Sequence, residues 1–283
     1  MNKPISPQKI QDVRMRTGVG LYKCKEALQE AGGDVKQAIH ILRKKGIASA
    51  VKKRGRETNE GLIEYVQDDQ GTVLVEVNAE TDFVVQTARF KEFVKNICMQ
   101  ALQSHTQSIE ELLKQKYYEQ PSLTIDEYCA EIIQIFGENI QIKRILHLAQ
   151  KAGQSLGVYS HMGGKIVAAV ILQGGDDFAT LAREVAMHVV AEAPDFLSPK
   201  DVSQDVILQE EDIIRNQVKN KPPEVMDKII QGKMQAFYEQ ACLLKQKFVK
   251  EPSISVKDFV TGEGKKMGKE LEILYFVRWQ IGE

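Results

Sequence analysis

Residues 61–90 read GLIEYVQDDQGTVLVEVNAETDFVVQTARF, and the hydrophobic period changes within this stretch. Its first part alternates strand-forming residues on both sides of an Asp-Asp-Gln-Gly turn at 68–71, which predicts a β-hairpin. The residues that follow take up a helical period. The chain therefore leaves the edge of a sheet and presents Thr81, Asp82 and Phe83 at the turn into a helix.

The same pattern recurs further along the chain. GVYSHM (157–162) and KIVAAVIL (165–172) flank a Gly-Gly turn and predict a second hairpin, followed by the helical stretch DDFATLAREVAMHVVAEAP. Both copies place Asp-Phe after a strand and before a helix rich in aliphatic residues. The offset of about 96 residues, from Gly61 to Gly157, predicts an internal duplication and hence an α+β fold with two related subdomains.

The segments around this core are predicted to be helical. Three short helices are expected before Gly46, the first capped by Ser6 and the third beginning at Asp34. We expect Gly46 to close the third helix. Further helices are predicted at 87–104, 108–118 and 125–136, a helical hairpin at about 203–250 with Pro222-Pro223 at its tip, and a last strand at LEILYFVRWQI. The predicted organisation is a three-helix module at 1–46, a basic linker at 47–60 that is either a plain connector or a helical arm, and core subdomains at 61–150 and 151–283.

The composition is that of an ordinary globular protein. The chain has 283 residues, of which 43% are hydrophobic and 27% charged. No apolar run approaches the roughly 20 residues that span a bilayer, and the first residues lack the apolar region of a signal peptide. The four cysteines lie far apart without a C-x-x-C pair, which favours a reducing compartment and argues against a zinc site. We therefore expect a cytoplasmic protein without membrane span, metal or cofactor.

The net charge of −1 conceals an asymmetry along the chain. Residues 1–56 hold 14 Lys and Arg but four acidic residues, a net charge of +10, and the remainder carries −11. So basic a segment indicates nucleic acid or an acidic protein surface as partner, or simply a solvated helical face.

None of the sequence patterns of covalent catalysis is present. The chain has no G-x-x-x-x-G-K-[ST], G-x-S-x-G or H-E-x-x-H, and its five histidines are scattered. A scattered histidine is more often structural than catalytic. The lysine-rich loop expected at 262–269 has the composition of a phosphate cradle, but a solvated turn is the simpler interpretation. The sequence therefore does not indicate an enzyme.

Asp82 and Phe83 allow two interpretations. In the structural one, which the pattern alone favours, Asp82 caps the following helix and Phe83 packs beneath it. In the functional one, the tip projects outward and the aromatic ring fills a pocket of a partner protein, since aromatic anchors dominate binding energy.

Four motifs, in this order along the chain, closely resemble bacterial elongation factor Ts. They are RMRTGVGLYKCKEAL, GDVKQAIHILRKKG, VEVNAETDFV and GENIQIKR (137–144), and the likeness extends from about residue 8 to the final strand. The N-terminal part is similar to the family's ubiquitin-associated-type three-helix module. The rest is similar to its duplicated core with an inserted helical hairpin.

This resemblance implies a guanine nucleotide exchange factor that binds the GTPase elongation factor Tu in its GDP-bound and nucleotide-free forms. The matching segment Thr81, Asp82, Phe83 and Val84 would unsettle the partner's magnesium ion, with Phe83 in an apolar pocket. His161 matches a histidine that supports this intrusion from the second half of the core. The residues that match the N-terminal contacts to the GTPase are Arg14, Leu21 and Tyr22.

The chain departs from the family pattern in two places. Leu21-Tyr22 stands where the family often has two methionines, and the chain stops at Gly282-Glu283 where some members continue into a helical module. We therefore expect that contact to be missing and the grip on the GTPase to be weaker. The resemblance leaves open a 1:1 complex or a dimer of such complexes.

Two other classes of function compete with the exchange factor. A nucleic-acid- or ribosome-binding protein led by residues 1–56 is supported by their charge, but Tyr22 is their one aromatic residue, so stacking on bases would be poor and no direct nucleic-acid binding is expected. A ubiquitin-binding type of adaptor would leave the large core unexplained.

Overall fold

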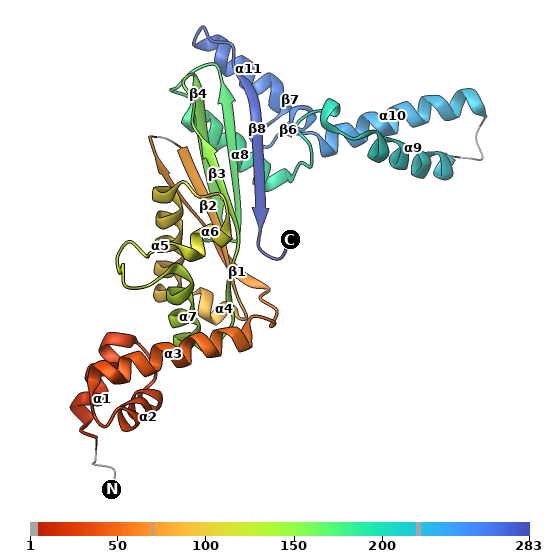
Figure 1. Cartoon of the computed structure of the whole chain (residues 1–283). Coiled ribbons are helices and arrows are strands. Elements are labelled where there is room, and N and C mark those ends of the chain that lie inside the picture. Colours follow the sequence, from red (N-terminus) through yellow and green to blue (C-terminus); the bar gives the residue numbers. More distant parts are fainter. Residues whose placement is uncertain (1–4, 70, 219–221) are drawn as a thin grey trace. The chain divides into compact units, whose positions relative to one another are not determined.

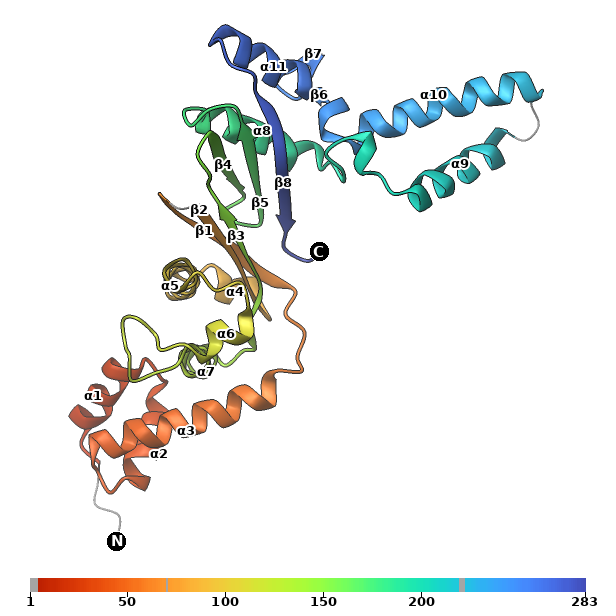
Figure 2. The ribbon, with the colours of Figure 1, turned by 45° about the horizontal axis from the view of Figure 1, so that its top comes forward.

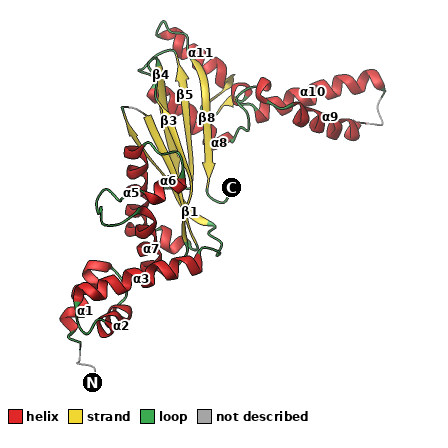
Figure 3. Cartoon of the chain, in the orientation of Figure 1, coloured by secondary structure: helices red, strands yellow, loops and turns green. Residues whose placement is uncertain are grey.

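The computed structural model describes residues 5–69, 71–218 and 222–283. It mixes helices with antiparallel sheets, so the predicted α+β class is confirmed (Figures 1 and 3). The chain divides into two compact units, one of residues 1–149 with 281–283 and the other of residues 150–280.

The first unit begins with the three predicted helices, α1 (Pro7–Thr17), α2 (Leu21–Glu30) and α3 (Val35–Lys53). Ser6 caps α1, since its hydroxyl accepts a hydrogen bond from the Lys9 amide. The Asp34 carboxylate caps α3 by accepting from the Gln37 amide at 2.8 Å. Their inner faces form a small apolar core.

The prediction that Gly46 ends the third helix is wrong. Helix α3 continues to Lys53, and Figure 2 shows it as one unbroken helix, so residues 47–53 of the predicted linker are helical. A Cβ atom on Gly46 would lie 2.7 Å from Oε1 of Gln134 on helix α7 (Ile125–Phe136). The glycine therefore allows two helices to pack closely, and it does not act as a cap.

A three-stranded antiparallel sheet follows, in the order β1 (Glu60–Asp68), β2 (Gly71–Ala79), β3 (Ile140–Ala149). The predicted first hairpin is confirmed; Gln70 of its turn lies outside the described residues. The short helix α4 (Asp82–Val85) and helix α5 (Ala88–Ser104) follow β2. One face of β2 buries its valines against the phenylalanines of α5, which forms the main core of this unit.

The helix predicted at 108–118 is shorter in the structure. Helix α6 (Ile109–Lys114) ends where the chain becomes extended, because the next residues bond to the segment before α7. The Tyr117 amide donates to the Leu123 carbonyl and the Ile125 amide to the Gln115 carbonyl. These backbone bonds replace the last helical turn.

The second unit also has a three-stranded antiparallel sheet, in the order β4 (Gln154–His161), β5 (Ile166–Gln173), β8 (Glu272–Gln280). The predicted second hairpin and last strand are therefore confirmed. Helix α8 (Ala179–Glu192) packs directly on β4: a Cβ atom on Gly157 would lie 2.1 Å from the Arg183 amide nitrogen.

The remaining elements of the second unit are mostly helical. They are η1 (Pro199–Asp201), α9 (Gln204–Val218), α10 (Pro223–Ala241), η2 (Leu243–Lys245), β6 (Lys247–Phe248), β7 (Glu251–Ser255) and α11 (Val256–Lys266). Helices α9 and α10 share an apolar seam.

Two predictions for this region are corrected. The helical hairpin ends at Ala241 instead of 250, and Pro223 begins α10 as its first residue, a position where the missing amide costs nothing. The loop expected at 262–269 lies mostly within α11, which Ser255 caps by accepting a hydrogen bond from the Asp258 amide. Among the described helices, none is long and apolar enough to cross a membrane.

Candidate binding site

The turn after β2 carries Phe83 out into solvent. This side chain is 82% exposed, whereas Val84 and Val85, the next two residues, are buried in the core of the first unit. Asp82 is also exposed, and it has no ion pair among the residues that the structure describes. Buried valines thus anchor a short helix that presents an aromatic ring and a carboxylate side by side.

The structural interpretation of Asp82 and Phe83 is wrong in both parts. Asp82 is the first residue of α4 and caps neither helix: the N-cap of α4 is Thr81, and that of α5 is Thr87, whose hydroxyl accepts from the Phe90 amide. The ring of Phe83 is not packed beneath a helix. The outward projection expected by the functional interpretation is what the structure shows.

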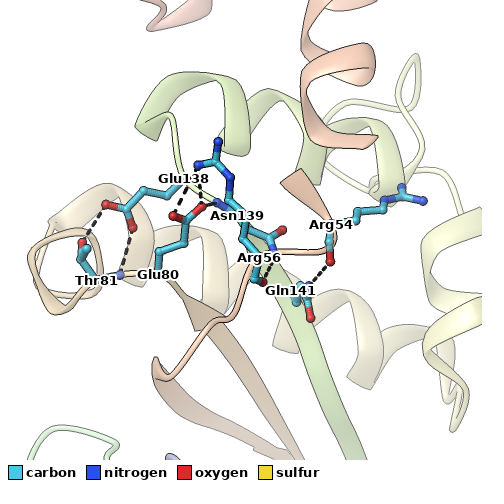
Figure 4. Close-up of polar contacts among 7 residues, drawn as sticks. All are labelled: Arg54, Arg56, Glu80, Thr81, Glu138, Asn139 and Gln141. Carbon is cyan, nitrogen blue, oxygen red and sulfur yellow. Dashed lines mark hydrogen bonds and ion pairs between the residues drawn. The ribbon is translucent and has the colours of Figure 1, made fainter. Parts of the chain in front are cut away.

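Residues just before β3 contact the residues just before Phe83 (Figure 4). The Glu138 carboxylate accepts hydrogen bonds from the amide and the hydroxyl of Thr81, at 3.0 and 2.7 Å. The Glu80 carboxylate accepts from the Asn139 amide and lies 3.3 Å from the Arg56 guanidinium. Sequence reasoning missed these contacts, although GENIQIKR contains Glu138 and Asn139; only the pairing of β2 with β3 brings them to the turn.

The N-terminal helices form a second exposed apolar feature. A groove of about 870 Å³ runs between α1 and α2, and Arg14, Leu21 and Tyr22 all line it. Tyr22 is 74% exposed and Leu21 49%. The structure therefore brings together the three N-terminal residues that the sequence singled out.

Met15 and Arg89 are among the further residues that line the groove and that sequence reasoning missed. Met15 is exposed and lines the same groove as Tyr22. Its position next to Arg14 in the sequence could have marked it as a candidate contact residue. Arg89 comes from α5, so the sequence alone could not place it here. A Cβ atom on Gly18, which has a φ of +68°, would lie 2.0 Å from an Arg89 guanidinium nitrogen. With Arg14 and Lys25, Arg89 gives this apolar groove a cationic rim.

His161 ends β4 and belongs to the second unit. It is exposed, its Nδ1 lies 3.4 Å from the Tyr159 hydroxyl, and the Arg183 guanidinium lies over the Tyr159 ring. The next residue, Met162, is exposed and has a φ of +50°, a backbone conformation that residues other than glycine adopt only at a cost in energy.

Metal ligands and thiols are the groups to consider for covalent chemistry in the described residues. They contain no group of three or more His, Cys, Asp or Glu side chains placed to hold a metal ion. All four thiols are buried, and burial raises the pKa of the Cys129 thiol to about 12, so this sulfur stays protonated and is a poor nucleophile. The exposed apolar and charged features are those of a surface that contacts another macromolecule.

Comparisons with known proteins agree on one family. The family model described as Elongation factor TS matches residues 80–283. The protein named Elongation factor Ts from Protochlamydia amoebophila is 49% identical over 279 residues, which cover 99% of each chain. Those from Chlamydia trachomatis serovar L2b and Chlamydia caviae are 42% and 44% identical, over 98% and 95% of this chain and 98% and 96% of their own.

Proposed function

The chain belongs to the elongation factor Ts family, and on that premise we propose that it is a guanine nucleotide exchange factor for elongation factor Tu in translation elongation. It binds the GDP-bound GTPase, displaces the magnesium ion and promotes release of GDP, so that GTP can bind. The observation that carries the proposal is the exposure of Phe83 at 82% on a helix that buried valines anchor. No covalent step is required, so the chain is a binding protein and not an enzyme.

The energetic basis of exchange is linkage between two binding events. A nucleotide held with nanomolar affinity is bound by about 12 kcal/mol, and its spontaneous release is slow. A partner that binds the nucleotide-free GTPase more tightly must weaken nucleotide binding by the same factor. Acceleration of release by about a thousandfold corresponds to a barrier lowered by about 4 kcal/mol.

Phe83 supplies part of this energy. Burial of an exposed phenylalanine ring is worth about 1.5–3 kcal/mol, and the ring gains it only if the pocket opens in the nucleotide-free partner. Asp82 engages the partner beside the ring. Displacement of Mg²⁺ then removes charge neutralisation from the phosphates and loosens the nucleotide further.

The other residues divide between anchoring and docking. Thr81 and Val84 complete the segment that unsettles the partner's magnesium ion, and they also hold its turn, since Val84 is buried and Thr81 is bonded to Glu138. His161 supports the intrusion of Phe83 from the second half of the core. The groove with Arg14, Leu21 and Tyr22 docks on the GTPase domain, and its cationic rim suits an acidic surface.

Release of a fluorescent GDP analogue from elongation factor Tu of the same organism tests the function. The chain should raise the release rate, and the rate should saturate as its concentration increases. A release rate that stays at its spontaneous value at all concentrations would exclude the proposal. An electrophoretic shift with RNA at physiological salt would then favour the nucleic-acid alternative, in which the basic segment 1–56 leads.

A further inference from the structure

We infer that Glu138 is a positioning residue for Phe83: its carboxylate fixes the turn from which the aromatic ring projects. The inference rests on the function proposed above. It follows from four contacts at the end of the first sheet, where the β2–β3 pairing stops and α4 begins.

The contacts continue the strand pairing beyond its last backbone pair. Ala79 and Ile140 are the last partners in the register of β2 and β3. The next pairs in that register are Glu80 with Asn139 and Thr81 with Glu138, and each is joined by a carboxylate in place of a carbonyl. Side chains thus extend the ladder by two residues, up to the one that precedes Asp82.

The two carboxylates act in opposite directions. Glu138 accepts from the backbone amide of Thr81, in the segment between β2 and α4. Glu80 accepts from the backbone amide of Asn139, in the segment just before β3. The side-chain amide of Asn139 in turn donates to the Arg56 backbone carbonyl at 2.8 Å (Figure 4). Each of the two segments is therefore held at a backbone amide by a carboxylate of the other segment. This fixes the direction in which the turn leaves the sheet.

The Thr81 hydroxyl does not make the hydrogen bond that is usual for a helix N-cap. At an N-cap, a threonine side chain normally accepts a bond from an amide of the first helical turn. Thr81 makes no such bond in α4, and its hydroxyl donates to Glu138 at 2.7 Å. The four-residue helix that carries Phe83 is thus tied at its start to the residues before β3 and not to its own backbone. A helix this short has little stability of its own, so the tie has to come from outside.

The Glu138 carboxylate satisfies two donors at once. Glu138 accepts two hydrogen bonds from one residue with its two oxygens, and bonds to a charged acceptor are about twice as strong as neutral ones. A glutamine there can accept from the Thr81 amide with its oxygen and donate to the Thr81 hydroxyl with its amide group, but it carries no charge. The change Glu138→Gln therefore keeps the size of the side chain and removes the charge that strengthens both bonds.

A double-mutant cycle on nucleotide release tests the assignment. Glu138→Gln should lower the exchange rate constant of the folded protein by roughly tenfold, since both bonds lose their charge assistance. In a Phe83→Ala background the same change should have less than about twofold effect, because there is no ring left to position. Thr81→Val, which removes only the hydroxyl bond, should show a smaller loss with the same dependence on Phe83.

The chain provides a matched control in the same unit. Glu111 also accepts a bond from a threonine hydroxyl, that of Thr106 at 3.0 Å, but at the start of α6. Glu111→Gln should leave the exchange rate at the wild-type value. An equal loss from Glu138→Gln with and without Phe83 would show a merely structural role and overturn the inference, as would exchange at the wild-type rate. If wild type itself does not accelerate release, the proposed function fails instead.

Discussion

Phe83 illustrates what can and cannot be predicted for a single residue. The sequence shows an aromatic residue after a strand and before a helix, and that pattern suits a buried ring as well as an exposed one. The helix begins at Asp82, so the two residues after Phe83 turn inward to the core and Phe83 turns outward. If α4 began at a different residue, the helix would turn different side chains toward the core and toward solvent. The local pattern does not fix that start; the tie between Thr81 and Glu138, which are 57 positions apart, does.

His188 carries a pH dependence of stability at the same scale. Its ring is fully buried: Nδ1 accepts from the Val249 amide at 3.1 Å, so Nε2 carries the proton and donates to Gln246 Oε1. Burial lowers the pKa of His188, against smaller opposing effects of Gln246 and Glu192. The unfolded chain, whose histidine titrates near pH 6.5, therefore binds protons that the folded chain rejects.

The contribution of His188 to stability is complete above about pH 6.5 and is lost as the pH falls from there through the lowered pKa, by about 1.4 kcal/mol for each pH unit that separates the folded and unfolded pKa values. Urea unfolding at pH 7.5 and 5.5 should show a larger loss for wild type than for His188→Gln, which keeps an acceptor for the Val249 amide. Equal losses in the two proteins would contradict this assignment.

At the scale of elements, local sequence signals predicted those helices and strands that such signals determine. Both hairpins, the caps at Ser6 and Asp34, and helix α7 with its bounds at Ile125 and Phe136 are present as predicted. Strand β3 was not predicted; it pairs with β2 across the helices that lie between them in the sequence. Gly46 was misjudged for a related reason: the partner helix that explains it lies about 90 residues further along the chain.

The packing at Gly46 can be tested against a glycine in open space. Leucine at Gly46 would have to displace the end of the buried Gln134 side chain, and such overpacking should cost about 1–3 kcal/mol of unfolding free energy. Gly232 lies within α10, and a Cβ atom there would have no neighbouring atom within 4 Å, so Gly232→Leu should be neutral or stabilising by up to about 1 kcal/mol through helix propensity. Chemical denaturation of both variants makes the comparison; a Gly46→Leu protein as stable as wild type would disprove the close packing.

Over the whole molecule, each unit builds a hairpin followed by a helix and adds a third strand beside the second strand of the hairpin. The two units therefore share this order of elements. The charge does not follow this shared order. The net charge of +10 belongs to residues 1–56, which contain the N-terminal helices and part of their connection to β1.

The charge of this segment predicts a salt dependence of association. Exposed charges act over about 8 Å at physiological ionic strength and less at higher salt, so added salt should slow binding to elongation factor Tu far more than it speeds dissociation. Stopped-flow rates measured over a range of salt concentrations provide the test. Lys36→Glu with Lys44→Glu, both exposed and outside the groove, should flatten the dependence. A salt effect confined to dissociation would contradict steering.

The central role of Phe83 is tested most directly by GDP release from elongation factor Tu with wild type, Phe83→Ala and Met267→Ala. Met267 is also exposed, at 62%, but lies just after α11, and its loss should leave exchange unchanged. Phe83→Ala should keep the thermal stability of wild type, because the ring is in solvent, and lose most of the acceleration. Acceleration by Phe83→Ala equal to that of wild type would show that the exposed ring is not what opens the nucleotide site.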